Sequence, residues 1–159
     1  MRGCFLFLLF SLSAPAFSQE YKSVSYTELI EASESLPDTL TIINFWATWC
    51  KPCIEEMPCL DELNEETVGQ PVRVILVSVD DENRWESALI PFLEKKQLKS
   101  EVWALQNDKP WDWIDRVSTK WSGAIPATLM LYEFETILVE ETFTRETLKE
   151  TIQTFLNNK

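Results

Sequence analysis

The chain has 159 residues, 45% of them hydrophobic, which suits one compact domain with a sizeable core. Its formal net charge is −12, and it contains no histidine. A charge of this sign argues against nucleic-acid binding, which needs a basic face, and against adhesion to anionic lipid.

The first 18 residues have the pattern of a signal peptide. Arg2 supplies a positive charge, Phe5 to Leu12 form an apolar run too short to span a bilayer, and Ala16-Phe17-Ser18 precedes a cleavage site. We expect an exported protein of the periplasm or cell-envelope space, whose mature chain starts near Gln19 and keeps no stable membrane anchor. The alternative is a buried N-terminal helix or strand.

Residues 19–38 are expected to form an extension that packs on the main domain, residues 39–159. The pattern within it predicts a strand and then a short helix around Tyr26 to Ser35, with Thr27 as its cap. Leu36-Pro37-Asp38 ends this segment.

Two continuous apolar runs, Leu40 to Ala47 and Val72 to Val79, indicate strands that are buried on both faces. With the helix between them they make a parallel βαβ unit. Asn83 to Gln97 is expected to be helical, with Pro91 kinking or dividing the helix. A short strand at Val102 to Leu105 and a helix at Trp111 to Thr119 follow.

The C-terminal part predicts an antiparallel hairpin and a closing helix. The strands are Ala127 to Tyr132 and Thr136 to Phe143, joined by Glu133-Phe134-Glu135 without the glycine that such turns usually carry. Thr144 caps the last helix. The chain as a whole predicts an α/β fold: a mixed central sheet with helices on both faces.

The segment Trp49-Cys50-Lys51-Pro52-Cys53 follows the first buried strand directly. Cys50 is placed at a helix N-terminus, where unpaired N–H groups and the helix dipole stabilise a thiolate. Cys53 lies one turn further, close enough to form a disulfide. Lys51 adds a positive charge, and Pro52 suits the first helical turn.

Other uses of this cysteine pair are less consistent with the sequence. Zinc usually needs four ligands, and no second pair of ligands is present. A purely structural disulfide across three residues gains little loop entropy. We therefore expect a redox-active Cys50–Cys53 disulfide with no metal and no other cofactor, and a spare thiol at Cys59 that serves as a small buried hydrophobic residue.

Two separated motifs resemble known proteins. Residues 44–53, Asn44-Phe45-Trp46-Ala47-Thr48-Trp49-Cys50-Lys51-Pro52-Cys53, resemble the active-site segment of the thioredoxin superfamily. The continuation Ile54-Glu55-Glu56-Met57-Pro58 resembles its secreted branch, the TlpA/ResA-like thiol-disulfide oxidoreductases. Gly123-Ala124-Ile125-Pro126-Ala127-Thr128 resembles the cis-proline loop of that family. The resemblance covers residue 39 to the C-terminus and implies a thioredoxin-like fold.

Glu56 is a candidate proton carrier. On a helical wheel it falls within an apolar stripe, where burial raises the pKa of a carboxyl group, and it could pass a proton to or from Cys53. The alternative places it at the edge of the stripe, in water. The stripe consists of Cys53, Met57, Leu60 and Leu63. Related secreted oxidoreductases carry a glutamate here, whereas the preceding strand offers only Asn44, which cannot carry a proton.

The resemblance also assigns a substrate-binding role to the loop at Pro126. It implies a cis Ile125–Pro126 bond and a backbone at Ile125 that pairs with an extended substrate segment. The alternative is an ordinary trans proline in a turn. Trp49 is expected to pack beside the disulfide and to offer an apolar contact to partners, with Trp121 nearby and Trp46 in the core.

The resulting hypothesis is an exported thiol-disulfide oxidoreductase that exchanges electrons with protein thiols and disulfides. The resemblance implies a reductant, for example in cytochrome c maturation, that is recharged by a membrane-embedded thiol electron donor; we expect a monomer. The alternatives are a disulfide-forming oxidase and a non-catalytic copper or haem chaperone. A peroxidase would need an activating arginine, and Thr48 to Pro58 contains none.

Overall fold

The computed structural model describes residues 20–106 and 113–158. The predicted signal peptide lies outside these residues, as does Trp111. No helix in the described ranges is long and apolar enough to cross a membrane.

Six strands form one mixed sheet in the order β1-β4-β3-β2-β5-β6. The strands are β1 (Lys22–Val24), β2 (Leu40–Trp46), β3 (Val72–Ser78), β4 (Glu101–Leu105), β5 (Ala127–Tyr132) and β6 (Glu135–Val139). The strands β1, β4, β3 and β2 run parallel to one another, while β5 runs antiparallel to both β2 and β6. The predicted mixed sheet, including the parallel β2–β3 pair, is confirmed.

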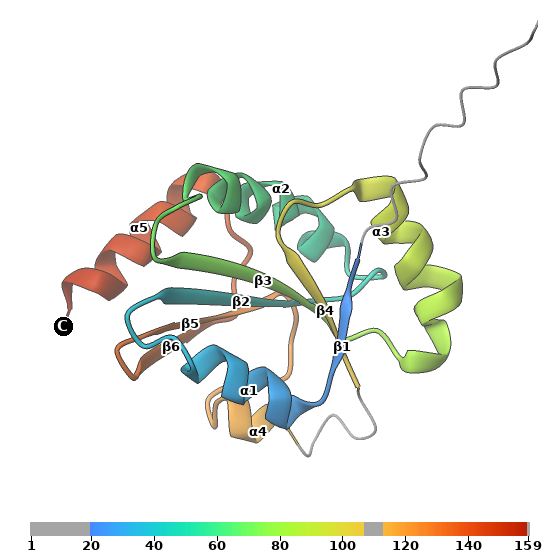
Figure 1. Ribbon diagram of the computed structural model, residues 1–159, viewed down its shortest axis with the longest axis horizontal. Helices are drawn as coiled ribbons and strands as arrows, with labels where there is room; N and C mark the ends of the chain where they lie inside the picture. Colours follow the sequence, from blue (N-terminus) through green and yellow to red (C-terminus); the bar gives the residue numbers. More distant parts are fainter. Residues whose placement is uncertain (1–19, 107–112, 159) are drawn as a thin grey trace, which may run out of the picture.

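Helices cover both faces of the sheet (Figure 1). On one face lie α2 (Lys51–Glu66), α3 (Ile90–Lys96) and α5 (Arg145–Asn157), and on the other lie α1 (Tyr26–Glu34) and α4 (Ile114–Val117). Each layer encloses its own hydrophobic cluster, and every residue of β2 is buried between them. A strand covered on both faces has no polar side to present to water, which explains its continuous apolar run.

The cap of α1 differs from the prediction. Ser25, not Thr27, precedes the helix, and its Oγ accepts a hydrogen bond from the Glu28 N–H at 3.3 Å. The Glu28 carboxylate in turn accepts the Ser25 N–H at 2.8 Å. This reciprocal capping box requires a glutamate three residues after the cap, which Ser25 has and Thr27 lacks.

The predicted helix at residues 83–97 is divided, as expected. It consists of a 3₁₀ turn, η1 (Glu82–Arg84), a π turn, η2 (Trp85–Leu89), and then α3. Pro91 lies in the first turn of α3. Proline has no N–H, and its ring crowds the preceding helical turn. That turn is accordingly the wider π-helical one, in which the Ile90 N–H donates to the Trp85 carbonyl five residues earlier.

The β5–β6 hairpin is confirmed, but its turn has two residues rather than three. Tyr132 pairs with Glu135, and the two residues between them, Glu133 and Phe134, have φ values of 49° and 69°. Positive φ at both positions is the geometry of a type I′ turn, here made without glycine. β6 ends at Val139, earlier than predicted, because the chain then leaves the sheet towards α5.

The remaining helices agree with the pattern in part. Thr144 caps α5 as expected, accepting the Thr147 N–H at 3.3 Å. Leu156 on the predicted apolar stripe is 37% exposed, whereas Leu148 and Phe155 are buried. The predicted helix at residues 111–119 is reduced to the single turn α4 within the described residues, because Ser118 adopts an extended backbone.

Candidate active site around the Cys50–Cys53 disulfide

The two cysteines of the predicted pair form a disulfide where β2 leads into α2. Their Cα atoms are 5.3 Å apart. Cys50 is the N-cap of α2, and its Sγ accepts the Cys53 N–H at 3.3 Å. The Cys53 N–H, which has no partner within the helix, therefore already donates to the sulfur that would carry negative charge after reduction.

Both cysteines are nearly inaccessible to solvent in the disulfide form. The side chain of Cys50 is 4% exposed, and that of Cys53 is 0% exposed. The cause is the neighbouring loop, because the Ile125 carbonyl oxygen lies 3.8 Å from the Cys50 Sγ. Of the two cysteines, Cys50 is the one nearer to solvent.

The Ile125–Pro126 peptide bond is cis, as predicted. Trp121 stabilises the loop that contains this bond, because its Nε1–H donates to the Ala124 carbonyl at 2.8 Å. The structure therefore brings together the two motifs, whose contacting residues, Cys50 and Ile125, are 75 positions apart in the sequence.

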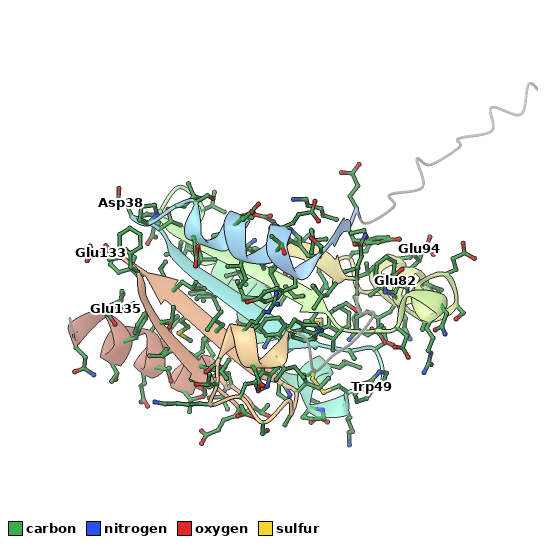
Figure 2. The ribbon with its side chains drawn as sticks, turned by 90° about the horizontal axis from the view of Figure 1, so that it is seen from below. Asp38, Trp49, Glu82, Glu94, Glu133 and Glu135 are labelled. Carbon is green, nitrogen blue, oxygen red and sulfur yellow. A yellow bond between two sulfur atoms is a disulfide. The ribbon has the colours of Figure 1, made fainter. Side chains whose placement is uncertain are left out.

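A largely apolar cavity of about 240 Å³ lies beside the disulfide. Trp49, which is 62% exposed, forms one side of it. Figure 2 labels Trp49 beside the start of α2. Trp113 and Trp121 are buried and pack on each other and on Phe45. Trp49 and Trp121 thus lie near the site as expected, and Trp46 is in the core. The rest of the lining consists of one charged residue, Asp81, and of Val79, Trp113, Ile114, Trp121, Gly123 and Ile125.

Glu56 is buried on the inner side of α2, only 2% exposed, together with the other members of the predicted stripe. Its carboxylate accepts the Asn44 Nδ2–H at 2.8 Å and the Phe143 N–H at 2.7 Å. Burial raises the pKa of Glu56, and these two hydrogen bonds offset part of the increase. The alternative of a solvated carboxylate at the edge of the stripe is wrong.

Lys51 and Pro52 occupy the first turn of α2, as predicted. The Lys51 side chain is 86% exposed, and its Nζ lies 3.5 Å from the Glu55 carboxylate. A surface pair of this kind contributes little to stability and partly offsets the lysine charge.

Cys59 behaves as the spare thiol that the sequence predicts. It is half-buried, and its Sγ lies 3.7 Å from the Phe143 carbonyl oxygen. Burial, followed by the nearby Glu56 carboxylate, raises the pKa of Cys59 to about 11. The thiolate form is therefore scarce at neutral pH, and thiol exchange at this position is slow.

Asp80 supports the loop before Cys50, a role that was not predicted from the sequence. Asp80 is completely buried just after β3, and its carboxylate accepts the Thr48 N–H at 2.9 Å and the Thr48 hydroxyl at 2.7 Å. The Ser78 hydroxyl also donates to it, at 2.9 Å. The available signal was an acidic residue immediately after an apolar strand, a position where burial requires such partners.

The surface away from the disulfide offers no metal site in the part of the chain that the structure describes. Among residues 20–106 and 113–158, no group of three or more histidine, cysteine, aspartate or glutamate side chains is arranged to hold a metal ion.

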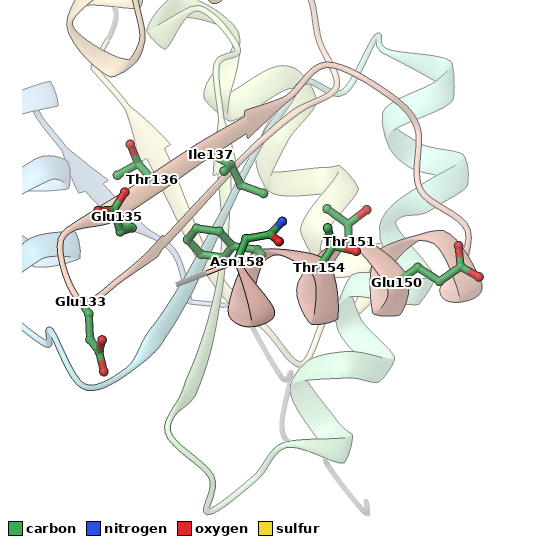
Figure 3. Close-up of a pocket in the computed structure, with 9 residues that line it drawn as sticks. Glu133, Glu135, Thr136, Ile137, Glu150, Thr151, Thr154 and Asn158 are labelled. Atoms are coloured by element: carbon green, nitrogen blue, oxygen red, sulfur yellow. The ribbon is translucent and has the colours of Figure 1, made fainter.

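A larger cavity, about 760 Å³, lies between β6 and α5 (Figure 3). Its lining, which includes Glu135, Ile137 and Glu150, shares no residue with the disulfide site.

Sequence relatives are thioredoxin-like proteins and oxidoreductases. The profile of the AhpC/TSA family matches residues 11–138. The thioredoxin-like protein YneN of Bacillus subtilis (strain 168) is 32% identical over 85 residues, which cover 54% of this chain and 47% of YneN. The thiol-disulfide oxidoreductase ResA of Bacillus cereus is 38% identical over 60 residues, 38% of this chain and 33% of ResA. These matches span a third to a half of the relatives.

Solved structures show the same fold. A thioredoxin-related protein from Neisseria meningitidis serogroup B superimposes with a TM-score of 0.64 at 19% identity, covering 76% of this chain and 87% of that protein. This likeness agrees with the family match, which extends over most of the sequence. The chain belongs to the AhpC/TSA family and has a thioredoxin-like fold.

Proposed function

We propose that the protein is a thiol-disulfide oxidoreductase that uses Cys50 and Cys53 as its redox-active pair. The observation that carries this proposal is the disulfide at the start of α2, with the Cys50 Sγ beside the Ile125 carbonyl. The similarity to ResA, which is named a thiol-disulfide oxidoreductase, supports it.

In the reducing direction, the Cys50 thiolate attacks one sulfur of a partner disulfide, and the other partner sulfur leaves as a thiolate. The Cys53 thiolate then attacks the Cys50 Sγ, which forms the Cys50–Cys53 disulfide and releases the second partner sulfur. Two electrons pass to the partner, and its two thiolates take up protons. The α2 N-terminus, including the Cys53 N–H, stabilises the attacking thiolate.

Glu56 acts in this proposal as a proton carrier for Cys53, which must lose its proton before it attacks. The two residues lie three apart on the buried side of α2. A carboxyl group with a raised pKa holds and releases a proton nearer to neutral pH than an exposed carboxyl group does.

The partner is a protein segment that lies extended across the loop at Pro126. The backbone of Ile125 offers strand-like pairing, and the cavity beside Trp49 accepts an apolar side chain of the partner. Lys51 and Pro52 complete the rim of the site at the start of α2.

The cellular setting is proposed from the N-terminal pattern and the resemblance. The protein is exported to the periplasm or cell-envelope space, acts there as a monomer, and reduces protein disulfides, for example in cytochrome c maturation. A membrane-embedded thiol donor returns it to the dithiol form.

Reduction of a model protein disulfide by the purified dithiol form tests the proposal. We expect turnover by the wild type and by Cys59→Ser, the matched control, and its loss in Cys50→Ser. Cys53→Ser should accumulate a mixed disulfide through Cys50, because the resolving thiol is missing. Turnover by Cys50→Ser equal to that of the wild type would contradict the proposal. Stoichiometric copper without reductase activity would favour a chaperone.

A further inference from the structure

Asn44 lies at the centre of β2 and contacts the candidate proton carrier. It is 1% exposed and pairs in register with Thr128 of β5. Its Nδ2 donates one hydrogen bond to the Glu56 Oε1 at 2.8 Å and another to the Thr128 Oγ1 at 3.0 Å. The amide therefore links β2, α2 and β5.

The oxygen atom of the same amide lacks the partner that a buried polar atom normally has. The Asn44 Oδ1 is buried and has no hydrogen-bond partner among the described residues. Buried polar atoms are nearly always paired, and a leucine of similar size would fill the position without this cost. The hydrogen bonds of the Asn44 side chain go to Glu56 and Thr128, which points to a role in the chemistry of Glu56.

A proton carrier needs a neighbour that suits both of its states. A carboxylate only accepts hydrogen bonds, whereas a carboxylic acid also donates one. The present amide orientation donates to Glu56 and suits the carboxylate. If the amide turns over, Oδ1 replaces Nδ2 and accepts the O–H of protonated Glu56, while Nδ2 moves to the position in which Oδ1 has no partner. The Thr128 hydroxyl can follow this change, because a hydroxyl group either accepts or donates.

We propose that Asn44 is a positioning residue whose amide holds the Glu56 carboxyl group in both protonation states and turns over when the proton moves. This inference rests on the proposed function of Glu56 as proton carrier. The Phe143 N–H, which donates to the Glu56 Oε2, keeps the carboxyl group in place throughout.

The groups around Glu56 that themselves titrate are on its own helix. Cys53 and Cys59 lie three residues before and after it, and the Cys59 thiol, with a pKa of about 11, stays protonated at neutral pH. The groups that face Glu56 from β2, β5 and the segment before α5 are the Asn44 amide, the Thr128 hydroxyl and the Phe143 N–H. None of these titrates, so in the disulfide form the titration observed at this cluster belongs to Glu56.

NMR titration of the Glu56 side-chain carboxyl carbon in the oxidised full-length protein tests the proposal. In Asn44→Leu both protonation states lose their hydrogen bond to the amide, but the bond to the charged carboxylate is the stronger of the two. We therefore expect the Glu56 acid dissociation constant to fall, by about tenfold. Thr128→Val keeps that donor but removes the contact that fixes the amide orientation, so a smaller fall is expected. Thr41→Val is the matched control: Thr41 is also buried on β2 with an unpaired Oγ1, and it should leave the titration unchanged.

The two proposals fail in different ways. Unchanged Glu56 titration in both Asn44→Leu and Thr128→Val would overturn the inference, and if Asn44→Leu does not fold, Thr128→Val decides. An equal fall in Thr41→Val would show a general effect of polarity in β2 and would also overturn it. Absence of disulfide exchange in the wild type would instead refute the proposed function, because the NMR titration does not depend on exchange.

Discussion

Glu56 is a carboxyl group in a place where a charge is costly. The α2 side chains around it are apolar, and its hydrogen bonds come from an amide and a backbone N–H rather than from a cation. Such donors stabilise the carboxylate without cancelling its charge, so burial remains the largest influence and the pKa stays raised. The residue thereby combines a fixed position with an easily changed protonation state.

The raised pKa predicts a pH dependence of stability. The folded state holds the Glu56 proton more tightly than the unfolded state, in which the pKa is about 4.3. The free energy of unfolding therefore decreases as the pH rises from that value through the raised pKa. Glu56→Gln has no proton to lose, so we expect the wild type to lose stability relative to this variant over that interval.

Urea unfolding of both oxidised proteins at several pH values measures this difference. All other carboxylates are common to the two proteins, including Glu101, whose pKa the Arg73 guanidinium lowers, and their contributions cancel. A difference in unfolding free energy that does not change with pH would show that Glu56 is not perturbed by burial.

For single residues, the sequence predicts the right groups but not their contacts. Helical periodicity alone places Glu56 on the buried side of α2, and the order of residues places Cys50 at the helix start. The bond from the Phe143 N–H to Glu56 joins residues 87 positions apart. No local pattern carries that information, and the same is true of the contacts that Asn44 and Asp80 make.

At the scale of elements, short hydrogen-bonded motifs decide where helices and turns begin. The sequence contains the complete capping box as Ser25-Tyr26-Thr27-Glu28. The predicted cap at Thr27 was wrong because it did not take into account Glu28, which pairs with Ser25. The β5–β6 turn was less predictable, because Glu133 and Phe134 adopt positive φ values that these residue types rarely take. The division at Pro91 follows directly from the missing N–H.

The cap of α1 gives a direct test at this scale. Ser25→Ala removes the hydroxyl that accepts the Glu28 N–H, and we expect it to lower the free energy of unfolding by about 1 kcal/mol. Thr27→Ala, the control, removes an exposed side chain from the first turn of α1 and should change it by less than about 0.5 kcal/mol. Chemical denaturation measures both, and equal losses in the two variants would contradict the assigned cap.

At the scale of the whole molecule, the sheet order brings the reactive groups together. The disulfide follows the carboxyl end of the central strand β2, and the neighbouring antiparallel strand β5 begins at the cis-proline loop. The apolar runs predict the β2–β3 pair because both strands are long and buried. The pairing of β1 with β4 was not predicted, since a strand of three residues has too few side chains to specify a distant partner.

The central claim is that Cys50 and Cys53 cycle together between dithiol and disulfide. The most direct measurement is a redox titration in glutathione buffers, followed by alkylation and mass analysis of each cysteine. We predict one two-electron transition in which Cys50 and Cys53 lose their label together while Cys59 stays alkylated. A midpoint near the value of about −270 mV known for thioredoxin fits a reductant, and one near about −120 mV fits an oxidase. Separate transitions of Cys50 and Cys53, or a disulfide that involves Cys59, would contradict the account.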